Sequence, residues 1–186
     1  SEALFHRALD AGITTFDCAN VYAGGRSEEL LGRFAGPHRD DLVLTTKAYF
    51  PTGQGPNDRG SSRLHLIRAV EASLKRLQTD HLDVMLLNTC DLETLQLGEA
   101  LEALSKAQQA GKVRFPGYSG DNQAIQFAIA HDNVFAIECL VHQYGRDFVG
   151  ELQLIFFQFT VLESLGEVRP TPISENVVAA GRVTTH

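Results

Sequence analysis

An aspartate, a tyrosine and a lysine lie at the ends of the first two strand-like runs of this sequence. Asp17 ends the run that begins at Thr14, and Tyr22 follows five residues later. Lys47 directly follows the run Leu42–Thr46. Tyrosine has an ordinary pKa of about 10, which a neighbouring ammonium lowers, and a carboxylate keeps that ammonium charged and in place. Where three such groups meet, the phenol can give a proton to a carbonyl oxygen as negative charge builds there, which supports hydride transfer to the carbonyl.

Other polar residues follow the later strand-like runs and are further candidates for a site. They are Asn88, Ser119 with the adjacent Gly120, and Glu138 with His142 just beyond it. Sites in parallel α/β sheets collect at the carboxyl ends of the strands, where all of these residues would lie. Any one of them taken alone is more typical of an ordinary surface loop, so the spacing by itself does not establish a site.

The elements that must position these residues alternate along the chain. Strand-like runs cover residues 14–18, 42–46, 82–87, 113–118 and 134–139, with helical patterns between them. Such alternation, with a period of about 30 residues, predicts βαβ units and a parallel sheet, as in a TIM-type barrel or an open doubly wound sheet. No GxGxxG follows any strand, so the Rossmann dinucleotide fingerprint is absent.

Caps and apolar spacing indicate where two of the helices lie. Ser27, which two glutamates follow, is the expected N-cap of the first helix. Ser61 and Ser62 offer caps for the next one. We expect its buried face to comprise residues three and four apart, namely Leu64, Ile67, Val70, Leu74 and Leu77.

Composition places the chain among ordinary globular proteins. It has 186 residues, 44% of them apolar, and a net charge of 16 − 23 = −7. That acidity argues against a nucleic-acid-binding protein, and no apolar run approaches the roughly 18 residues of a membrane span. Cys18, Cys90 and Cys139 are widely spaced and odd in number, which predicts reduced thiols in the cytoplasm rather than a zinc site. We therefore expect neither a nucleic acid nor a membrane as a partner.

Four segments together resemble the aldo-keto reductase superfamily. They are AGITTFDCANVYAGGRSEELLG, LVLTTK, LKRLQTDHLDVMLLN and GKVRFPGYSGDN, which begin at residues 11, 42, 74 and 111. They occur in the family's order and spacing, and the resemblance covers about residues 1–144. It implies an α/β fold, a (β/α) TIM-type barrel of the aldo-keto reductase kind. The barrel is expected to be incomplete at both ends, because the family's first strand and C-terminal cofactor-binding region have no match.

The resemblance also implies an activity, the reduction of an aldehyde or ketone by NADP(H). Tyr22 would be the general acid, Lys47 its activator and Asp17 their electrostatic partner. Asn88 stands where the family carries a catalytic histidine. The residues that the resemblance places at the cofactor are Asp17, Ser119, Gly120, Glu138 and His142.

Two departures from the family pattern support an alternative without efficient turnover. Asn88 can donate a hydrogen bond to a carbonyl but, unlike histidine, it cannot titrate. After Tyr144 there is no segment rich in serine and arginine to hold the adenosine 2′-phosphate, so NADP(H) would bind weakly or not at all. The alternative is a catalytically impaired relic that acts as a binding or interaction protein. A third hypothesis, a sugar- or phosphate-binding barrel fragment, rests on fold analogy alone.

The alternation ends near residue 145, and the chain divides there into a partial barrel (residues 1–144) and a divergent segment (residues 145–186). This segment would complete the same domain or mediate association. Within it, Leu152–Leu162 is rich in phenylalanine and uncharged, which indicates a buried strand or helix, or alternatively a dimer surface. The open edges of a partial barrel expose unpaired N–H and C=O groups. We therefore expect this run to cover an edge, and we predict a homodimer or larger assembly.

Overall fold

The computed structural model describes residues 2–120, 123–132, 134, 136–141 and 156–161. Its strands form one sheet in the order β1-β2-β3-β4-β5-β6, in which β1 to β5 are parallel and β6 is antiparallel to β5. Their bounds are β1 (Thr15–Asp17), β2 (Val43–Ala48), β3 (Leu82–Asn88), β4 (Val113–Ser119), β5 (Ala136–Val141) and β6 (Phe156–Val161). A strand order that follows the sequence without reversal is that of a TIM-type barrel and not of a doubly wound sheet.

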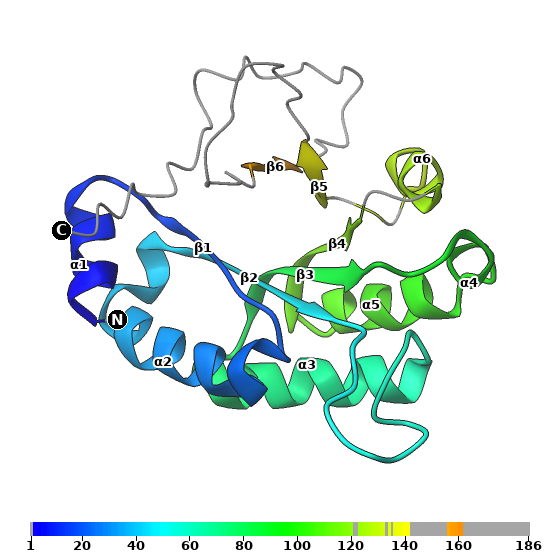
Figure 1. Cartoon of the computed structure of the whole chain (residues 1–186), viewed down its shortest axis with the longest axis horizontal. Helices are drawn as coiled ribbons and strands as arrows, with labels where there is room; N and C mark the ends of the chain where they lie inside the picture. The colour runs from blue at the N-terminus through cyan, green and yellow to red at the C-terminus, as the bar shows by residue number, and fades with distance from the viewer. Residues whose placement is uncertain (1, 121–122, 133, 135, 142–155, 162–186) are drawn as a thin grey trace, which may run out of the picture.

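Helices connect the parallel strands and cover one side of the sheet. Their bounds are α1 (Glu2–Asp10), α2 (Arg26–Ala35), α3 (Arg63–Leu77), α4 (Leu92–Gln96), α5 (Glu99–Gln109) and α6 (Ala124–Ile129), with 3₁₀ turns η1 (Tyr22–Gly25) and η2 (Gly36–Asp41). α2 packs on α3 and α3 on α5. Figure 1 shows these three helices together on one side of β1 to β4. The predicted alternation and parallel sheet are confirmed.

The two faces of the sheet differ in what they bury. Met85 and Leu87 of β3 belong to the main apolar core under the helices. Val84 and Leu86 instead join Val43 of β2 in a second, much smaller cluster. Because successive side chains on a strand alternate, this second cluster lies on the opposite face, which is the inner face in a barrel. The position of each residue along its strand therefore tells which face its side chain occupies.

α3 is rotated about its axis from the predicted orientation. Leu64 and Ile67 are 43% and 45% exposed, so their predicted burial is wrong, whereas Val70, Leu74 and Leu77 are buried as predicted. The apolar and small residues that are buried are Leu66, Ala69, Val70, Ser73, Leu74 and Leu77. α3 packs against α2, α5 and β2, and the face that meets these elements carries Leu66 rather than Leu64 and Ile67. The approach to α2 is close, because a Cβ added to Gly32 would lie 2.4 Å from the backbone carbonyl of Leu77.

The start of α2 also differs from the prediction, which placed the N-cap at Ser27. The N-cap is Gly25, and no side chain caps the helix. Ala23, Gly24 and Gly25 are all left-handed, with φ of 50°, 65° and 93°, so the chain leaves η1 and enters the helix at once. Gly25 is also required by space, because a Cβ there would lie 2.9 Å from Cδ of Arg76.

The loop between β2 and α3 is closed at its base and bonded to the first turn of α3. The Gly60 N–H donates to the Tyr49 carbonyl at 2.7 Å, which joins the two ends of the loop. Nδ1 of His65 lies 3.3 Å from the Asn57 carbonyl, and the imidazole is buried. Burial lowers the pKa of His65, so the neutral ring donates this bond from Nδ1. The helix itself begins at the expected cap, Ser62.

β6 falls within the phenylalanine-rich run. It pairs along the whole of β5, with Phe156 opposite Val141 and Val161 opposite Ala136. The run therefore covers one edge of the parallel sheet. The predictions for residues 142–155 and 162–186 lie outside the described residues. In the part of the chain that the structure describes, no helix has the length and apolar character of a membrane span.

Candidate active site

The carboxyl ends of four neighbouring strands bring most of the predicted polar residues to one rim. The last residues of β1, β3 and β4 are Asp17, Asn88 and Ser119, and Lys47 is the next to last residue of β2. Asp17 is in register with Thr45, and Asn88 with Ser119. Counting by twos from the inner cluster places all four side chains on the inner face. This is the end of the sheet where barrel sites are built.

Lys47 is the buried centre of the rim. Its side chain is 3% exposed and forms an ion pair with Oδ1 of Asp17, whose side chain is 39% exposed. The ammonium also lies 6.0 Å from the centroid of the Tyr22 ring. A buried charge is costly unless it is paired, so this lysine depends on its partners. The structure thus brings the three predicted residues together, and Tyr22 is 43% exposed.

A hydrogen-bonded turn positions Tyr22. The Asn20 N–H donates to the Lys47 carbonyl at 3.1 Å, and the Tyr22 N–H donates to the Ala19 carbonyl at 3.0 Å. Tyr22 is then the first residue of η1, whose left-handed turn ends at Gly25, directly before α2. The place of the phenol therefore depends on β2 on one side and on α2 on the other.

Asn88 and Ser119 lie side by side at the next two strand ends. The Thr89 N–H donates to the Ser119 carbonyl at 2.7 Å. Thr89 has a φ of 53°, a left-handed conformation that a β-branched residue rarely adopts, and such strain concentrates at functional sites. The amide and the hydroxyl together offer donors and acceptors, which is the set that a carboxamide group needs.

The remaining predicted residues are placed less completely. A Cβ at Gly120 would lie 2.8 Å from the Tyr118 hydroxyl oxygen, so a larger residue would displace that ring. Glu138 is the register partner of Ser119, which places its backbone at the same rim. His142 lies outside the described residues.

Glu28 is a buried acidic residue near the rim that is not among the site residues predicted from the sequence. Its side chain is 0% exposed. Its Oε1 accepts a hydrogen bond from Oγ1 of Thr46 at 2.6 Å, and its Oε2 accepts one from Nε of Arg76 at 2.6 Å. The signal in the sequence is spacing, because Glu28 shares a helical face with the buried Gly32 and Ala35. A carboxylate on a buried face must have partners.

The two cysteines whose side chains are described are poor nucleophiles. Cys18 and Cys90 are both buried. Burial, helped by the nearby Glu28 carboxylate, raises the pKa of Cys18 to about 11, and burial also raises the pKa of Cys90. Both thiols are therefore protonated near pH 7 and unreactive. Among the described side chains, no three acidic, histidine or cysteine groups are arranged to hold a metal.

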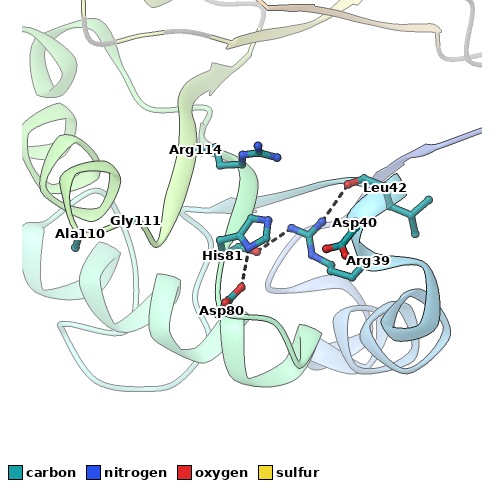
Figure 2. Close-up of a pocket in the computed structure, with 8 residues that line it drawn as sticks. All are labelled: Arg39, Asp40, Leu42, Asp80, His81, Ala110, Gly111 and Arg114. Atoms are coloured by element: carbon teal, nitrogen blue, oxygen red, sulfur yellow. Dashed lines mark hydrogen bonds and ion pairs between the residues drawn. The ribbon is translucent and has the colours of Figure 1, made fainter.

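A pocket of about 580 Å³ lies at the opposite, amino end of the strands (Figure 2). Leu42 and His81, which directly precede β2 and β3, line it together with Gly111, Arg39 and Arg114. Both guanidinium groups bind Asp83, at 2.8 and 3.0 Å, and the Asp83 side chain is 4% exposed. The arginines thus neutralise a buried carboxylate at the starts of the strands. We assign this cluster a structural role and place the candidate site at the carboxyl ends.

The strand order, the helix-covered outer face and the polar rim define a partial TIM-type barrel with its site at the end usual for that fold. The model of the Aldo/keto reductase family matches residues 1–145. The chain therefore belongs to the aldo/keto reductase family, and the resemblance noted in the sequence is confirmed.

The relatives include a protein named as a reductase and a protein named as a potassium channel subunit. The chain is 44% identical over 97 residues to a probable voltage-gated potassium channel subunit beta of Oryza sativa subsp. japonica, covering 50% of this chain and 29% of the relative. It is 33% identical over 148 residues to the L-glyceraldehyde 3-phosphate reductase of Escherichia coli (strain K12), covering 76% and 42%. The solved structure of aldo-keto reductase AKR11C1 from Bacillus halodurans (holo form) matches with a TM-score of 0.68 and 27% identity, covering 75% and 48%. The chain thus spans less than half the length of these relatives.

Proposed function

We propose that the chain carries the proton-donating residues of a reductase that transfers hydride from NADPH to an aldehyde or ketone. The observation that carries the proposal is the cluster around Lys47. A buried ammonium is paired with Asp17 and lies 6.0 Å from the centroid of the ring of a half-exposed phenol. Few structural roles require a tyrosine beside a buried lysine at the rim of a barrel, whereas proton donation to a carbonyl does.

In this proposal Tyr22 is the general acid. Its hydroxyl donates a hydrogen bond to the carbonyl oxygen of the substrate and gives up the proton as that oxygen gains negative charge. Lys47 stabilises the phenolate that remains, and Asp17 holds Lys47 in place. The C=O π bond and the Tyr22 O–H bond break, and a C–H bond and an O–H bond form in the product alcohol. The hydride would come from NADPH, which would be oxidised to NADP⁺, and Tyr22 regains its proton from water. Asn88 lies at the neighbouring strand end and can donate a second hydrogen bond to the carbonyl oxygen.

The residues at the ends of β3 and β4 fit a nicotinamide carboxamide. Ser119 brings a hydroxyl beside the strained Thr89 bend, and Gly120 leaves the adjacent backbone unobstructed by a side chain. NADPH, when bound, supplies the hydride. We propose that Ser119 and Gly120 hold its carboxamide, that Asp17 also lies beside the cofactor, and that Glu138 and His142 lie further along the same rim.

The test is a pair of matched tyrosine substitutions. Tyr22→Phe removes the proposed acid, and kcat should fall by about 10²-fold or more while NADPH affinity changes little. Tyr118→Phe removes the same hydroxyl from a residue of the main core, where it donates to the Cys90 carbonyl at 2.9 Å, and should leave kcat within about threefold of the parent. Equal rates in Tyr22→Phe and the parent would refute the proposal. NADPH titration of Ser119→Ala, followed by fluorescence, tests the cofactor site separately.

The second candidate is a binding protein with little turnover. Asn88 supports it, because an amide cannot exchange a proton with the substrate as histidine can. The relative from Oryza sativa, whose printed name is that of a channel subunit, also supports a role in partner binding. Saturable NADPH binding without reduction of any aldehyde or ketone would favour this candidate over the first.

We also propose self-association in a reducing compartment such as the cytoplasm. In the described part of the chain β1 pairs only with β2 and lies at an edge of the sheet, which favours pairing with another chain. The buried thiol of Cys18 is consistent with a reducing compartment. Light scattering at micromolar concentration should give at least twice the mass of one chain, and a monomeric mass would exclude the assembly.

A further inference from the structure

We propose that Glu28 is a positioning residue that fixes Tyr22 relative to Lys47. It does so by joining the helix that continues from the tyrosine turn to the strand that carries the lysine. The proposal deepens the function above and rests on it, because only a proton donor and its activator need a fixed separation.

The first observation is the short path between the two groups through Glu28. Glu28 lies six residues after Tyr22, in the first turn of the helix into which η1 runs. Its Oε1 accepts the hydroxyl hydrogen of Thr46 at 2.6 Å, and Thr46 is the neighbour of Lys47 on β2. Thr46 points to the helices and Lys47 to the inner face, so this one bond connects the outside of the sheet to the rim.

The second observation is that the Arg76 side chain contacts the turn that carries Tyr22. Its Nε donates to Oε2 of Glu28 at 2.6 Å, and its stem lies against Gly25, where a Cβ would come within 2.9 Å of Cδ. Gly25 ends the turn that begins at Tyr22. The carboxylate therefore holds β2, α2, α3 and the tyrosine turn in one fixed arrangement.

A positioning role explains why a charged group is buried here. Replacing a buried ion pair with apolar residues of similar volume is often neutral or stabilising, so stability alone is a weak reason for a fully buried carboxylate. Charge-assisted hydrogen bonds are short and directional, which suits a part whose task is to hold two elements at a set distance. A displacement of about 1 Å at a reacting group can reduce a rate by about 10²-fold.

The same sheet offers a matched control in the cluster around Asp83. This carboxylate is similarly buried, is bound by two arginines, and accepts the Leu44 N–H of β2 at 2.9 Å. It lies at the amino end of the strands, away from Tyr22. Substitution of Asp83 disturbs a comparable buried ionic cluster and leaves the turn that carries Tyr22 unchanged.

The experiment compares Thr46→Val, Thr46→Ser and Asp83→Asn in the full chain. Turnover of a carbonyl substrate is measured together with the titration of Tyr22, followed by ¹³C NMR with labelled tyrosine. We expect Thr46→Val to lower kcat about tenfold or more at unchanged NADPH affinity, and to raise the Tyr22 titration midpoint by about 0.5 pH units or more. Thr46→Ser, which keeps the hydroxyl, should leave both kcat and the Tyr22 titration midpoint at their parent values. Asp83→Asn should lower the urea midpoint of unfolding and leave both site measurements at parent values.

The NMR titration separates this proposal from the function on which it rests. If the parent shows no turnover, the reductase function fails, but a Tyr22 titration that moves in Thr46→Val still supports the positioning role. If that titration stays at the parent value in Thr46→Val, or moves as far in Asp83→Asn, the proposal is overturned. Glu28→Gln, which keeps the side-chain volume but loses the charge, is the second variant and should lower kcat as Thr46→Val does, at unchanged NADPH affinity.

Discussion

The two side chains of the ion pair between Lys47 and Asp17 differ in burial. This difference predicts unequal losses of stability for two substitutions. The lysine side chain is 3% exposed, whereas the aspartate side chain is 39% exposed. Asp17→Asn leaves an ammonium buried without its carboxylate. Lys47→Met replaces that ammonium with an apolar group of similar length and leaves a carboxylate that water can still reach.

The size of each effect follows from these exposures. Removing one partner of a fully buried pair costs about 3–5 kcal/mol, and solvent screening at the half-exposed Asp17 reduces this to about 2 kcal/mol for Asp17→Asn. Lys47→Met should change the free energy of unfolding by less than about 1 kcal/mol, because methionine fills the site without a charge. The double variant should resemble Lys47→Met, with a coupling energy of about 2 kcal/mol.

Urea unfolding at pH 7 measures all four proteins. With a slope of about 2 kcal/mol per molar urea, the midpoint of Asp17→Asn should fall by about 1 M, and that of Lys47→Met should stay within about 0.5 M of the parent. Equal losses in the two single variants, or additive losses in the double variant, would show that the lysine does not depend on Asp17 as the geometry requires. Both variants should lose reductase activity, so activity alone does not separate them.

Four further predictions follow from particular contacts. Gly32→Ala should cost about 2–4 kcal/mol of unfolding free energy, because a Cβ there lies 2.4 Å from backbone of α3, while Gly36→Ala, with nothing within 4 Å, should change it by less than about 0.5 kcal/mol by urea unfolding. Asn88→His should raise kcat and add a titration near neutrality to the pH–rate profile, and identical profiles would refute the role given to position 88. Cys18, with its pKa raised to about 11, should react with an aromatic disulfide at pH 8 only when urea unfolds the chain. Burial lowers the pKa of His65, so the unfolded chain binds its proton first, and stability should decline as the pH falls below about 6.5; His65→Asn should flatten that decline in urea melts at pH 7 and 5.

Local patterns in the sequence were sufficient for the elements and for most of the rim. Apolar runs that end in Asp17, Lys47 and Asn88 marked the strands, because a strand buried on both faces must be apolar until it reaches the edge of the core. The alternation with helices then required a parallel sheet. The carboxyl ends of parallel strands meet at one edge, so the sequence predicts a common rim for the candidate residues.

Helix details were less well predicted where a neighbour decides them. Leu64 and Ile67 have the right spacing for a buried face, yet they are partly exposed, because α3 turns Leu66 instead toward the elements on which it packs. Ser27 has the composition of a cap, but the left-handed turn ending at Gly25 starts the helix earlier. Spacing tells which residues share a face of a helix, and only the packing partner tells which face is buried.

The family, the alternation of strands with helices and the identity of the residues at the strand ends follow from the sequence alone, since these depend on local composition and on motifs. The tertiary structure decided which of those residues meet. Lys47 loses its water and pairs with Asp17 only because β1 lies beside β2. Glutamate is usually a surface residue, but the packing of α2 buries Glu28. Its carboxylate is then satisfied by hydrogen bonds from Thr46 and Arg76. Ion pairs form between residues that are distant in the sequence, and no local pattern predicts which element will exclude water from them.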